Sequence, residues 1–539
     1  MASAADREGG EAAPLPRPAS PELPTPGVAA LPVASRGLLT VGVMLATIMQ
    51  ILDSTIANVA LPHMQTALGA TADTVTWVLT SYIVASAVAI PLTGWLSDTI
   101  GSRNLFLISV VGFIFSSMLC GLATSLPEMV VFRILQGVSA AFMNPLSQTV
   151  MLDINTPENQ PKAMAIWGMG IMVGPILGPV LGGWLTDNYN WRWVFYVNLP
   201  IGVFCFAVLW FLLPSRPKRE RPFDMIGFGL LTLGIASLQM MCDRGPSEDW
   251  FQSGELWVEA LLAFAGFWMF AVHLATAKKP MFDRELFANR NLVTGLGFML
   301  VIGVVMMATM ALLPPMLQSL YGYPVLDTGL LLMPRGMGIV FSMWVATQLT
   351  QRGLDPRWLV GIGLSIAALS LWEMTGWTLV MSSESFVISG LVQGLGLGLV
   401  FMPLNAIAFA TLSPAYRTEG SSLLNLFRNL GASVGISVVT AQLARGIQTS
   451  HADLAGHITP EALSGLDPGL IQGLGGIGST VFAMIDGEVN RQAAMIAYLD
   501  DFWLMTVVTA LVVPLVVLLR KPPPRPGMVQ EKAAPVDLH

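Results

Sequence analysis

Apolar runs of about 20 residues recur along nearly the whole 539-residue chain, and each is long enough to cross a hydrocarbon core of about 30 Å. Lipid offers the backbone no hydrogen-bonding partner, so a spanning segment must satisfy its own N–H and C=O groups, as a helix does. Charged residues make up 11% of the sequence, against about 25% in an average soluble domain. The chain is therefore predicted to be an all-α polytopic membrane protein.

The apolar runs divide into fourteen expected spanning helices. These lie near residues 37–61, 74–97, 103–123, 127–151, 161–187, 191–213, 222–242, 255–277, 290–315, 326–350, 356–378, 385–412, 417–446 and 498–520. Because the number is even, both termini are expected on one side of the membrane. Residues 1–36 and 521–539 are predicted to be disordered tails on that side, and the first lacks the basic and apolar regions of a signal peptide.

The positive charges test this topology, since cytoplasmic segments of membrane proteins are enriched in Lys and Arg. With both termini in the cytoplasm, the richest patches, at 215–222 and 277–290, fall on the cytoplasmic side. Only four of the 27 Lys and Arg then fall in external segments: Arg192, Arg244, Arg445 and Arg491. This asymmetry favours fourteen spans with cytoplasmic termini.

Two segments of the chain echo each other. Q-G-V-S-A-A-F-M-N-P-L at 136–146 resembles Q-G-L-G-L-G-L-V-F-M-P-L at 393–404, and residues 168–175 resemble 429–435. The echo predicts two six-helix bundles, 37–213 and 290–520, with the two helices of 214–289 inserted between them. Parallel six-helix repeats are typical of rocking-bundle transporters, whose substrate site lies between the halves. The alternative is that glycine-rich packing sequence looks alike anywhere.

The loop G-W-L-S-D-T-I-G-S-R at 94–103 joins the second and third spans on the cytoplasmic side. It resembles the signature loop of the major facilitator superfamily, although Thr99 and Ser102 stand where that family usually has basic residues. The resemblance implies ion pairs that hold the two halves together at this loop, with fewer basic residues than is usual in the family. The candidate gating residues of the loop are Gly94, Asp98, Gly101 and Arg103.

Five further motifs, taken together, resemble the EmrB/QacA branch of that superfamily, the drug:proton antiporters. They are L-D-S-T-I-A-N-V-A-L-P (52–62), W-V-L-T-S-Y (77–82), F-R-I-L-Q-G (132–137), G-P-I-L-G-P-V-L-G-G (174–183) and N-W-R-W-V-F-Y-V-N-L-P-I-G (190–202). The resemblance implies a major facilitator fold with fourteen spans in a bacterial inner membrane. It also implies proton-coupled export of small hydrophobic or amphipathic compounds, as in multidrug efflux.

The segment 174–183 has its own physical interpretation. Glycines recur every four residues from 170 to 182 on one helix face, which lets a neighbouring helix approach closely, and two prolines remove backbone donors. A helix of this kind can seal the space between two halves; the alternative is ordinary packing without gating. The candidate gating residues here are Gly174, Pro175, Gly178 and Pro179.

Charged residues within the predicted spans are candidates for function, because an ionisable group is costly in lipid. Asp53 lies about 16 residues into the first span, or ~24 Å along it, and Arg133 lies ~9 Å from the external start of the fourth. The two are thus at similar depth, and they are expected to pair directly or through water. A carboxylate balanced between lipid and a guanidinium can load and release a proton. The alternatives are a permanent Asp–Arg pair or a pair with Asn58.

Glu373 is the second acid that we expect to be buried, and its place near the external end of its span favours a position at the lipid interface or the mouth of the cavity; it is the third proton-coupling candidate. Two further buried bases, in the tenth and thirteenth spans, make buried bases more numerous than acids. Neutral or anionic amphiphiles therefore fit the site as well as cations. The candidates for the substrate cavity are Asn58, Trp77, Tyr82, Phe142, Arg335 and Arg428.

The segment 447–497 is the longest expected external excursion and forms part of the second bundle. Most helix connections take about 2–8 residues, so we expect it to be a docking surface outside the transport path. Segments 331–336 and 425–431 look closest to branch members from Gram-negative bacteria, so a periplasmic adaptor protein and an outer-membrane channel are candidate partners. The alternative is a disordered loop, since the entropic cost of closing a loop grows slowly with its length.

Other functional classes fit less well. No lysine follows a glycine, so the phosphate-binding loop of a primary pump is absent, and we expect no enzymatic activity, cofactor, metal or nucleic-acid partner. The chain is expected to act as a monomer. Export of one endogenous metabolite, lipid or siderophore is an alternative that the sequence does not separate from multidrug efflux. A non-transporting scaffold or receptor would gain nothing from buried charges.

Overall fold

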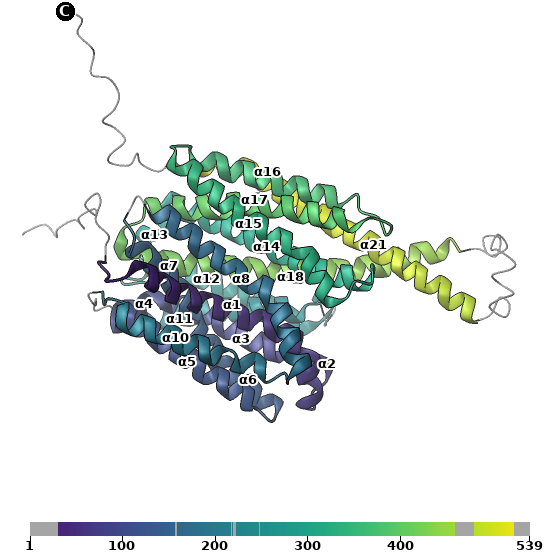
Figure 1. Ribbon diagram of the computed structural model, residues 1–539, viewed down its shortest axis with the longest axis horizontal. Helices are drawn as coiled ribbons and strands as arrows, with labels where there is room; N and C mark the ends of the chain where they lie inside the picture. The colour runs from purple at the N-terminus through teal and green to yellow at the C-terminus, as the bar shows by residue number, and fades with distance from the viewer. Residues whose placement is uncertain are drawn as a thin grey trace, which may run out of the picture.

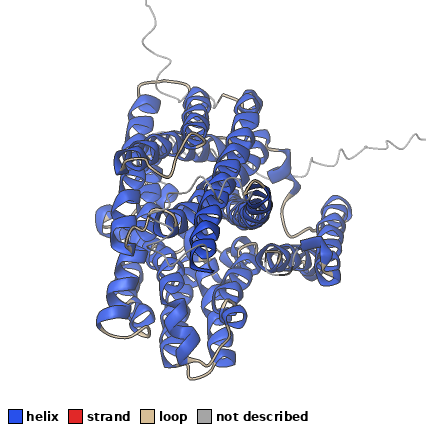
Figure 2. Ribbon diagram, turned by 90° about the vertical axis from the view of Figure 1, so that its right-hand side faces the viewer, coloured by secondary structure: helices blue, strands red, loops and turns tan. Residues whose placement is uncertain are grey.

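The computed structural model describes residues 31–156, 159–216, 218, 222–246, 248, 250–458 and 479–521. Within these residues the secondary structure is helical throughout, with turns between the helices (Figure 2). The first part of the chain contains α1 (Arg36–Ala67), α2 (Ala72–Val75), α3 (Trp77–Ala89), α4 (Leu92–Ile100), α5 (Ser102–Leu122), α6 (Leu126–Ala141), α7 (Met143–Asp153), α8 (Gln160–Asn188), α9 (Trp193–Tyr196) and α10 (Asn198–Leu212).

The second part continues with the inserted pair and the second set of long helices. It contains α11 (Met225–Arg244), η1 (Trp250–Gln252), α12 (Gly254–Thr276), α13 (Arg284–Ala288), α14 (Arg290–Ser319), α15 (Val325–Gln351), α16 (Pro356–Met374), α17 (Ser383–Ala410), η2 (Pro414–Tyr416), α18 (Arg417–Gly456), α21 (Ser479–Val512) and η3 (Val513–Leu518).

Twelve helices of the described chain are long and apolar enough to cross a membrane. The 29-residue α8 and the shorter apolar helix α3 are not among these twelve, and with them the number would reach the fourteen spans that the sequence predicts. Pro91, at the junction of α3 and α4, has no backbone N–H to donate, so the helix is interrupted there. At Gly101 the backbone has a φ of 94°, which glycine adopts without strain, and the chain turns into α5.

The long helices pack in the same pairs in both parts of the chain. In the first part α1 packs on α8, and α3 and α5 pack on α6. In the second part α14 packs on α18, and α15 and α16 pack on α17 (Figure 1). The same three pairings therefore occur twice, in the order that the sequence echo predicts.

The inserted helices lie beside this double bundle. α11 packs on α12 and also contacts α3 and α18, so it touches one helix from each half. Thr80 on α3 donates a hydrogen bond to Asp243 on α11, and Ser433 on α18 donates one to Gln239 of the same helix. Few residues of α12 are buried, as expected for a helix that faces lipid.

Both ends of the described chain lie at one end of the bundle. The N–H group of Leu31 donates to the Asp153 carbonyl oxygen at the end of α7, and Asn291 at the start of α14 donates to the Arg520 carbonyl oxygen. At the opposite end, α18 and α21 extend past the other helices as two arms (Figure 1).

These arms change the prediction for 447–497. The sequence suggests an external segment between helices ending at 446 and starting at 498, but α18 continues to Gly456 and α21 begins at Ser479. The segment is thus largely made of helix extensions, and residues 459–478 lie outside the described chain. The arms contact each other, since His451 Nε2 lies 3.0 Å from Asp486 Oδ1.

Candidate functional site

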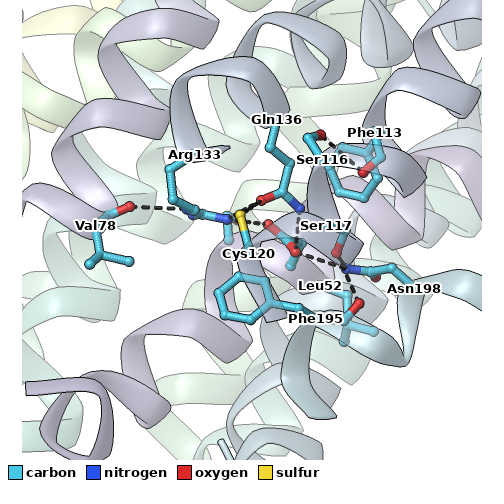
Figure 3. Close-up of polar contacts among 12 residues, drawn as sticks. Leu52, Val78, Phe113, Ser116, Ser117, Cys120, Arg133, Gln136, Phe195 and Asn198 are labelled. Carbon is cyan, nitrogen blue, oxygen red and sulfur yellow. Dashed lines mark hydrogen bonds and ion pairs between the residues drawn. The ribbon is translucent and has the colours of Figure 1, made fainter. Parts of the chain in front are cut away.

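Asp53 belongs to a buried polar network in the first half. Figure 3 shows this network and labels the Asp53 partners Arg133, Gln136 and Asn198. The Asp53 side chain on α1 is almost fully buried, and both carboxylate oxygens accept hydrogen bonds. Oδ2 accepts from Arg133 Nη1 at 2.7 Å, and Oδ1 accepts from Gln136 Nε2 and from Asn198 Nδ2, each at 2.8 Å. One charged donor from α6 and two neutral donors from α6 and α10 therefore hold the carboxylate.

Arg133 is held on several sides at once. Its Nε donates to the Val78 carbonyl oxygen at 3.0 Å, and Nη1 also reaches Gln136 Oε1 at 2.8 Å. The guanidinium carbon lies 4.1 Å from the ring centroid of Tyr82 and 5.8 Å from that of Phe195, and aromatic faces attract cations. Its Nη2 is buried without a hydrogen-bond partner among the described residues. This nitrogen leaves one donor available for a rearranged state.

A second layer of side chains positions the amides that contact Asp53. Asn198 Nδ2 also lies 3.0 Å from Ser117 Oγ on α5, and that hydroxyl donates to the Phe195 carbonyl oxygen at 2.9 Å. Cys120 Sγ donates to Gln136 Oε1 at 3.5 Å. The network thus links α1, α5, α6 and α10, so a change in the contacts of Asp53 alters the hydrogen bonds among four helices.

The structure confirms that Asp53 and Arg133 pair directly, but it corrects the neutral partner. Asn58 is exposed, and Asp53 accepts from Gln136 and Asn198 instead. Five residues correspond to about 140° around a helix, so residues 53 and 58 cannot share a face. Gln136, three residues after Arg133, lies on the same helix face, and this spacing could have identified it from the sequence.

The second half contains a related arrangement with a different chemistry. α6 crosses α3 closely at Gly137, where an added methyl group would lie 2.4 Å from the Tyr82 carbonyl oxygen. α17 crosses α15 in the same way at Gly394, where an added methyl group would lie 2.1 Å from the Arg335 carbonyl oxygen. These two crossings are equivalent in the sequence repeat. Arg335 on α15 therefore occupies the position that Tyr82 occupies on α3.

The counterpart of Asp53 carries no acid. Gly174 lies against Ile51, and its counterpart in the repeat, Gly435, lies against Val304. Ile51 and Val304 are therefore equivalent, and Met306, two residues after Val304, is the counterpart of Asp53. Arg335 Nη2 donates to the Met306 carbonyl oxygen at 3.2 Å and to Thr309 Oγ1 at 2.6 Å. Within the described residues, the acid–base pair is therefore a feature of the first half.

Two other acids differ from the sequence prediction. Glu373, expected as a second buried acid, is exposed near the end of α16, where it contacts the Ser389 hydroxyl; its position at the end of the helix agrees with an interface or mouth site. Asp501 on α21 was missed. It is fully buried, and neither carboxylate oxygen has a hydrogen-bond partner among the described residues. The sequence suggests a last span of 498–520, which puts Asp501 near its start. α21 instead begins at Ser479, 22 residues before Asp501, so Asp501 lies well inside this helix.

A small cavity lies between the halves. Its lining residues come from α7 and α8 in the first half and from α14, α17 and α18 in the second: Gln148, Trp167, Met299, Phe401, Asn405, Leu424, Asn425 and Arg428. Gln148 Nε2 donates to Asn405 Oδ1 across the interface at 2.8 Å. The rings of Trp167 and Phe401 stack with centroids 6.3 Å apart. The cavity thus combines amide groups, aromatic faces and one guanidinium.

Of the six residues predicted for the substrate cavity, Arg428 lines this one. Tyr82 instead packs on Arg133, and Arg335 bonds within the second half. Asn58 and Trp77 are exposed, and Phe142 is buried where α6 meets α7. Aromatic residues were expected to line the cavity, but the ones that do so are Trp167 and Phe401. Sequence alone did not distinguish them because aromatic residues are frequent in every span.

The ion pairs between the halves lie at the end of the bundle where both described chain ends are found. Asp153 at the end of α7 accepts from Arg417 Nη1 of α18 at 3.1 Å and also pairs with Arg216. Arg216 Nη1 lies 3.4 Å from Thr418 Oγ1. Burial, assisted by neighbouring Arg417 and opposed by Asp98, lowers the pKa of Arg216 to about 10, so it stays cationic at neutral pH.

The loop at 94–103 contributes to this closure partly as predicted. Gly94 faces the second half, since a methyl group there would lie 2.4 Å from the Glu419 side chain. Arg103 instead bonds within the first half, where its Nη2 donates to the Trp210 carbonyl oxygen at 2.6 Å. Among the described residues, Asp153 is the centre of a charge contact between the halves, and no motif of the sequence pointed to it.

Comparison with known families agrees with this architecture. The sequence profile described as Major Facilitator Superfamily matches residues 43–436. The chain belongs to this superfamily. Solved superfamily structures share its fold at low sequence identity. The proton:xylose symporter XylE matches with a TM-score of 0.55 at 13% identity over 89% of this chain and 96% of its own, and the human organic anion transporter MFSD10 matches with 0.56 at 14% over 88% and 99%.

Superfamily members of more similar sequence are bacterial export and resistance proteins. The multidrug export protein EmrB of Haemophilus influenzae is 38% identical over 78% of this chain and 83% of its own. EmrB of Escherichia coli strain K12 is 35% identical over 87% and 92%, and the fatty acid resistance protein FarB of Neisseria gonorrhoeae is 35% identical over 91% and 97%. This superfamily member is thus a multi-pass membrane transporter of EmrB type.

The Asp153 ion pairs should hold the two halves of this superfamily member together. Asp153→Asn leaves the buried Arg417 and the partly exposed Arg216 without their anion. Breaking a fully buried pair costs about 3–5 kcal/mol, and the exposure of Arg216 lowers this cost. We expect a loss of at least about 1.4 kcal/mol, which is a roughly tenfold fall in the closed population. Double electron–electron resonance should show a longer distance between spin labels at Asn104 and Arg352 in Asp153→Asn than in the wild type. Asp355→Asn, which breaks an ion pair with Arg357 inside the second half, should change nothing. An unchanged distance in Asp153→Asn would show that other contacts hold the halves together.

Proposed function

We propose that this protein is a proton-coupled antiporter that exports small hydrophobic or amphipathic compounds from a bacterial cell, as in multidrug efflux. The observation that carries the proposal is the buried Asp53–Arg133 pair in a chain of EmrB-type sequence. Both termini lie in the cytoplasm and the transporter works as a monomer in the inner membrane. The charge asymmetry supports the first statement, because external segments contain few Lys and Arg.

Asp53 is the proton carrier in this scheme. Its carboxylate accepts three hydrogen bonds, one of them from a cation, so a proton that neutralises it weakens its hold on Arg133 and favours displacement of Arg133, Gln136 or Asn198. Displacement changes the contacts of α1 with α6 and α10. Proton binding is thus linked to a movement of helices, which is what an antiporter requires.

The glycine-rich face of α8 carries this movement toward the second half. Methyl groups at Gly174 and Gly178 would lie 2.5 Å and 2.0 Å from the side chains of Ile51 and Thr55, which flank Asp53 on α1. The Thr55 hydroxyl also lies 3.2 Å from the Gly174 carbonyl oxygen. Helices this close move together. α8 also packs along α15 and α17, so Gly174, Pro175, Gly178 and Pro179 act as the gating segment.

Two alternatives remain distinct from multidrug efflux. A dedicated exporter of one endogenous metabolite, lipid or siderophore would use the same proton site, and a panel of compounds tested in an efflux-deficient host separates the two. The name of the related FarB refers to fatty acid resistance, which makes amphipathic acids a useful part of the panel. A scaffold or receptor would show no gradient-driven transport.

The arms of α18 and α21 provide the docking surface for a periplasmic adaptor, which passes substrate to an outer-membrane channel. They extend beyond the other helices, and their described parts expose Phe482 and Met484. Exposed apolar side chains outside the membrane suit a protein partner.

Asp53→Asn should abolish uphill transport while leaving exchange of substrate for substrate intact. The amide keeps the size of the side chain but binds no proton at neutral pH. Uptake into proteoliposomes under an imposed pH gradient measures the first activity, and counterflow without a gradient measures the second. Asp355→Asn is the matched control. Gradient-driven accumulation by the Asp53→Asn protein would disprove the assignment.

Arg133 should have to remain cationic and planar. Lysine keeps the charge but cannot contact Asp53, Gln136 and the Val78 carbonyl oxygen together, so Arg133→Lys should lower kcat roughly tenfold. Arg133→Ala should stop turnover. Initial rates in proteoliposomes between about pH 6 and 8 test this. Arg445→Ala, at an exposed position, serves as control, and normal rates for Arg133→Ala would exclude the pair from coupling.

Replacing 452–488 by a short Gly/Ser linker should separate docking from transport. These limits keep the buried residues Ala493 and Met495 of α21 in place. We expect normal proton-coupled uptake into inside-out vesicles but a loss of resistance in whole cells. Lost vesicle transport would indicate that the arms belong to the transport machinery, and unaltered resistance would indicate that no partner needs them.

A further inference from the structure

Arg428 differs from the other buried arginines of the described chain. Arg133 pairs with Asp53, Arg417 pairs with Asp153, and Arg335 donates to Thr309. The Arg428 side chain makes no hydrogen bond or ion pair with any described residue, although it is partly buried and lines the cavity between the halves. An uncompensated cation at such a depth is costly, so a ligand that supplies the missing charge would be bound favourably.

The neutral amides of the cavity already have partners. Gln148 Nε2 donates to Asn405 Oδ1 at 2.8 Å, and Gln148 Oε1 accepts from Asn425 Nδ2 at 3.2 Å and from the Ser421 hydroxyl at 2.5 Å. Asn405 Nδ2 donates to the Phe401 carbonyl oxygen at 2.8 Å. The amides therefore bridge the two halves and leave the guanidinium available.

A second residue of the lining also has a donor that lacks a partner. Trp167 is almost fully buried, and its Nε1 has no hydrogen-bond acceptor among the described residues. An indole N–H only donates, and a guanidinium only donates as well. Two lining residues thus have unpaired donors, which favours a ligand with an acceptor, and the charge of Arg428 favours an anionic one.

The remaining walls select the body of the ligand. Trp167 and Phe401 stack at an interplanar angle of 17°, and Met299 and Leu424 add flexible apolar surface. Flat aromatic faces and thioethers bind apolar groups of varied shape. In this state the halves enclose only about 10 Å³ here, so a ligand enters when they move apart. The chemistry of the lining then suits an apolar body that carries one negative group.

We infer that Arg428 is a specificity-determining residue that anchors a single anionic group of the exported compound, with the Trp167 N–H as second donor and the Trp167–Phe401 pair holding the apolar body. This inference rests on the proposed export function. Arginine does not lose its proton in proteins, so the anchor stays charged through the cycle. Loading and release both depend on movement of the halves, because Trp167 and Arg428 come from opposite halves.

Equilibrium binding tests the anchor without a gradient, so its result is independent of coupling. The probes are tritiated anilinonaphthalene sulfonate and tritiated phenylnaphthylamine, which share one aromatic body with and without the sulfonate. Binding is measured by scintillation proximity on full-length protein in phosphatidylcholine nanodiscs, with empty nanodiscs subtracted.

Arg428→Gln should weaken binding of the sulfonate at least about tenfold and change binding of the neutral amine less than about twofold, because only the sulfonate loses an ionic partner. Arg428→Lys should recover part of the loss. Phe401→Leu should weaken both probes alike, and Arg445→Gln should affect neither.

Three results would overturn the inference: equal binding of the sulfonate by wild type and Arg428→Gln, equal loss of both probes in Arg428→Gln, or no sulfonate binding by the wild type. Nanodiscs with added phosphatidylglycerol separate an exported anion from a lipid headgroup. If that lipid abolishes sulfonate binding, the site belongs to lipid and the assignment to substrate fails. Gradient-driven transport of the same probes then tests the export function separately.

Discussion

A charge pair kept out of water inside a membrane protein is the interaction on which this structure depends. Asp53 and Arg133 could not be buried singly, since an isolated charge in a medium of low polarity is very unfavourable. Together, and with the amides of Gln136 and Asn198, they satisfy both carboxylate oxygens. The surrounding helices are arranged to make this possible: α1 brings the acid, α6 the base and one amide, and α10 the other amide.

The two halves share one packing plan but differ in charge. Glycines at equivalent positions let pairs of helices cross with their backbones in contact. α6 crosses α3 in this way, and α17 crosses α15. On this common frame the first half places Asp53 next to an arginine, whereas the second half places Met306 and Thr309 next to Arg335. The fold therefore repeats, whereas the described residues show the buried acid–base pair in the first half only.

The interface between the halves divides into regions with different roles. At the end of the bundle where both ends of the described chain lie, Asp153 connects Arg216 and Arg417 by ion pairs. Deeper in the bundle, Gln148, Asn405 and Asn425 connect the halves through neutral hydrogen bonds, which are easier to break and remake. The unpaired guanidinium of Arg428 lies beside this neutral layer.

Much of the fold could be predicted from the sequence by itself, because the length and hydropathy of a span follow from bilayer thickness and the backbone's need for hydrogen bonds. Depth along a helix is also a local property, at about 1.5 Å per residue, and it placed Asp53 and Arg133 at one level. Only the tertiary structure decided which neutral groups complete their network, because Gln136 and Asn198 meet Asp53 through the angles at which α6 and α10 cross α1. The same holds for Asp153, Trp167 and Arg428, whose partners, or lack of them, are set by helices more than 200 residues apart. Such contacts arise from the packing of whole surfaces, and no local pattern in the sequence encodes them.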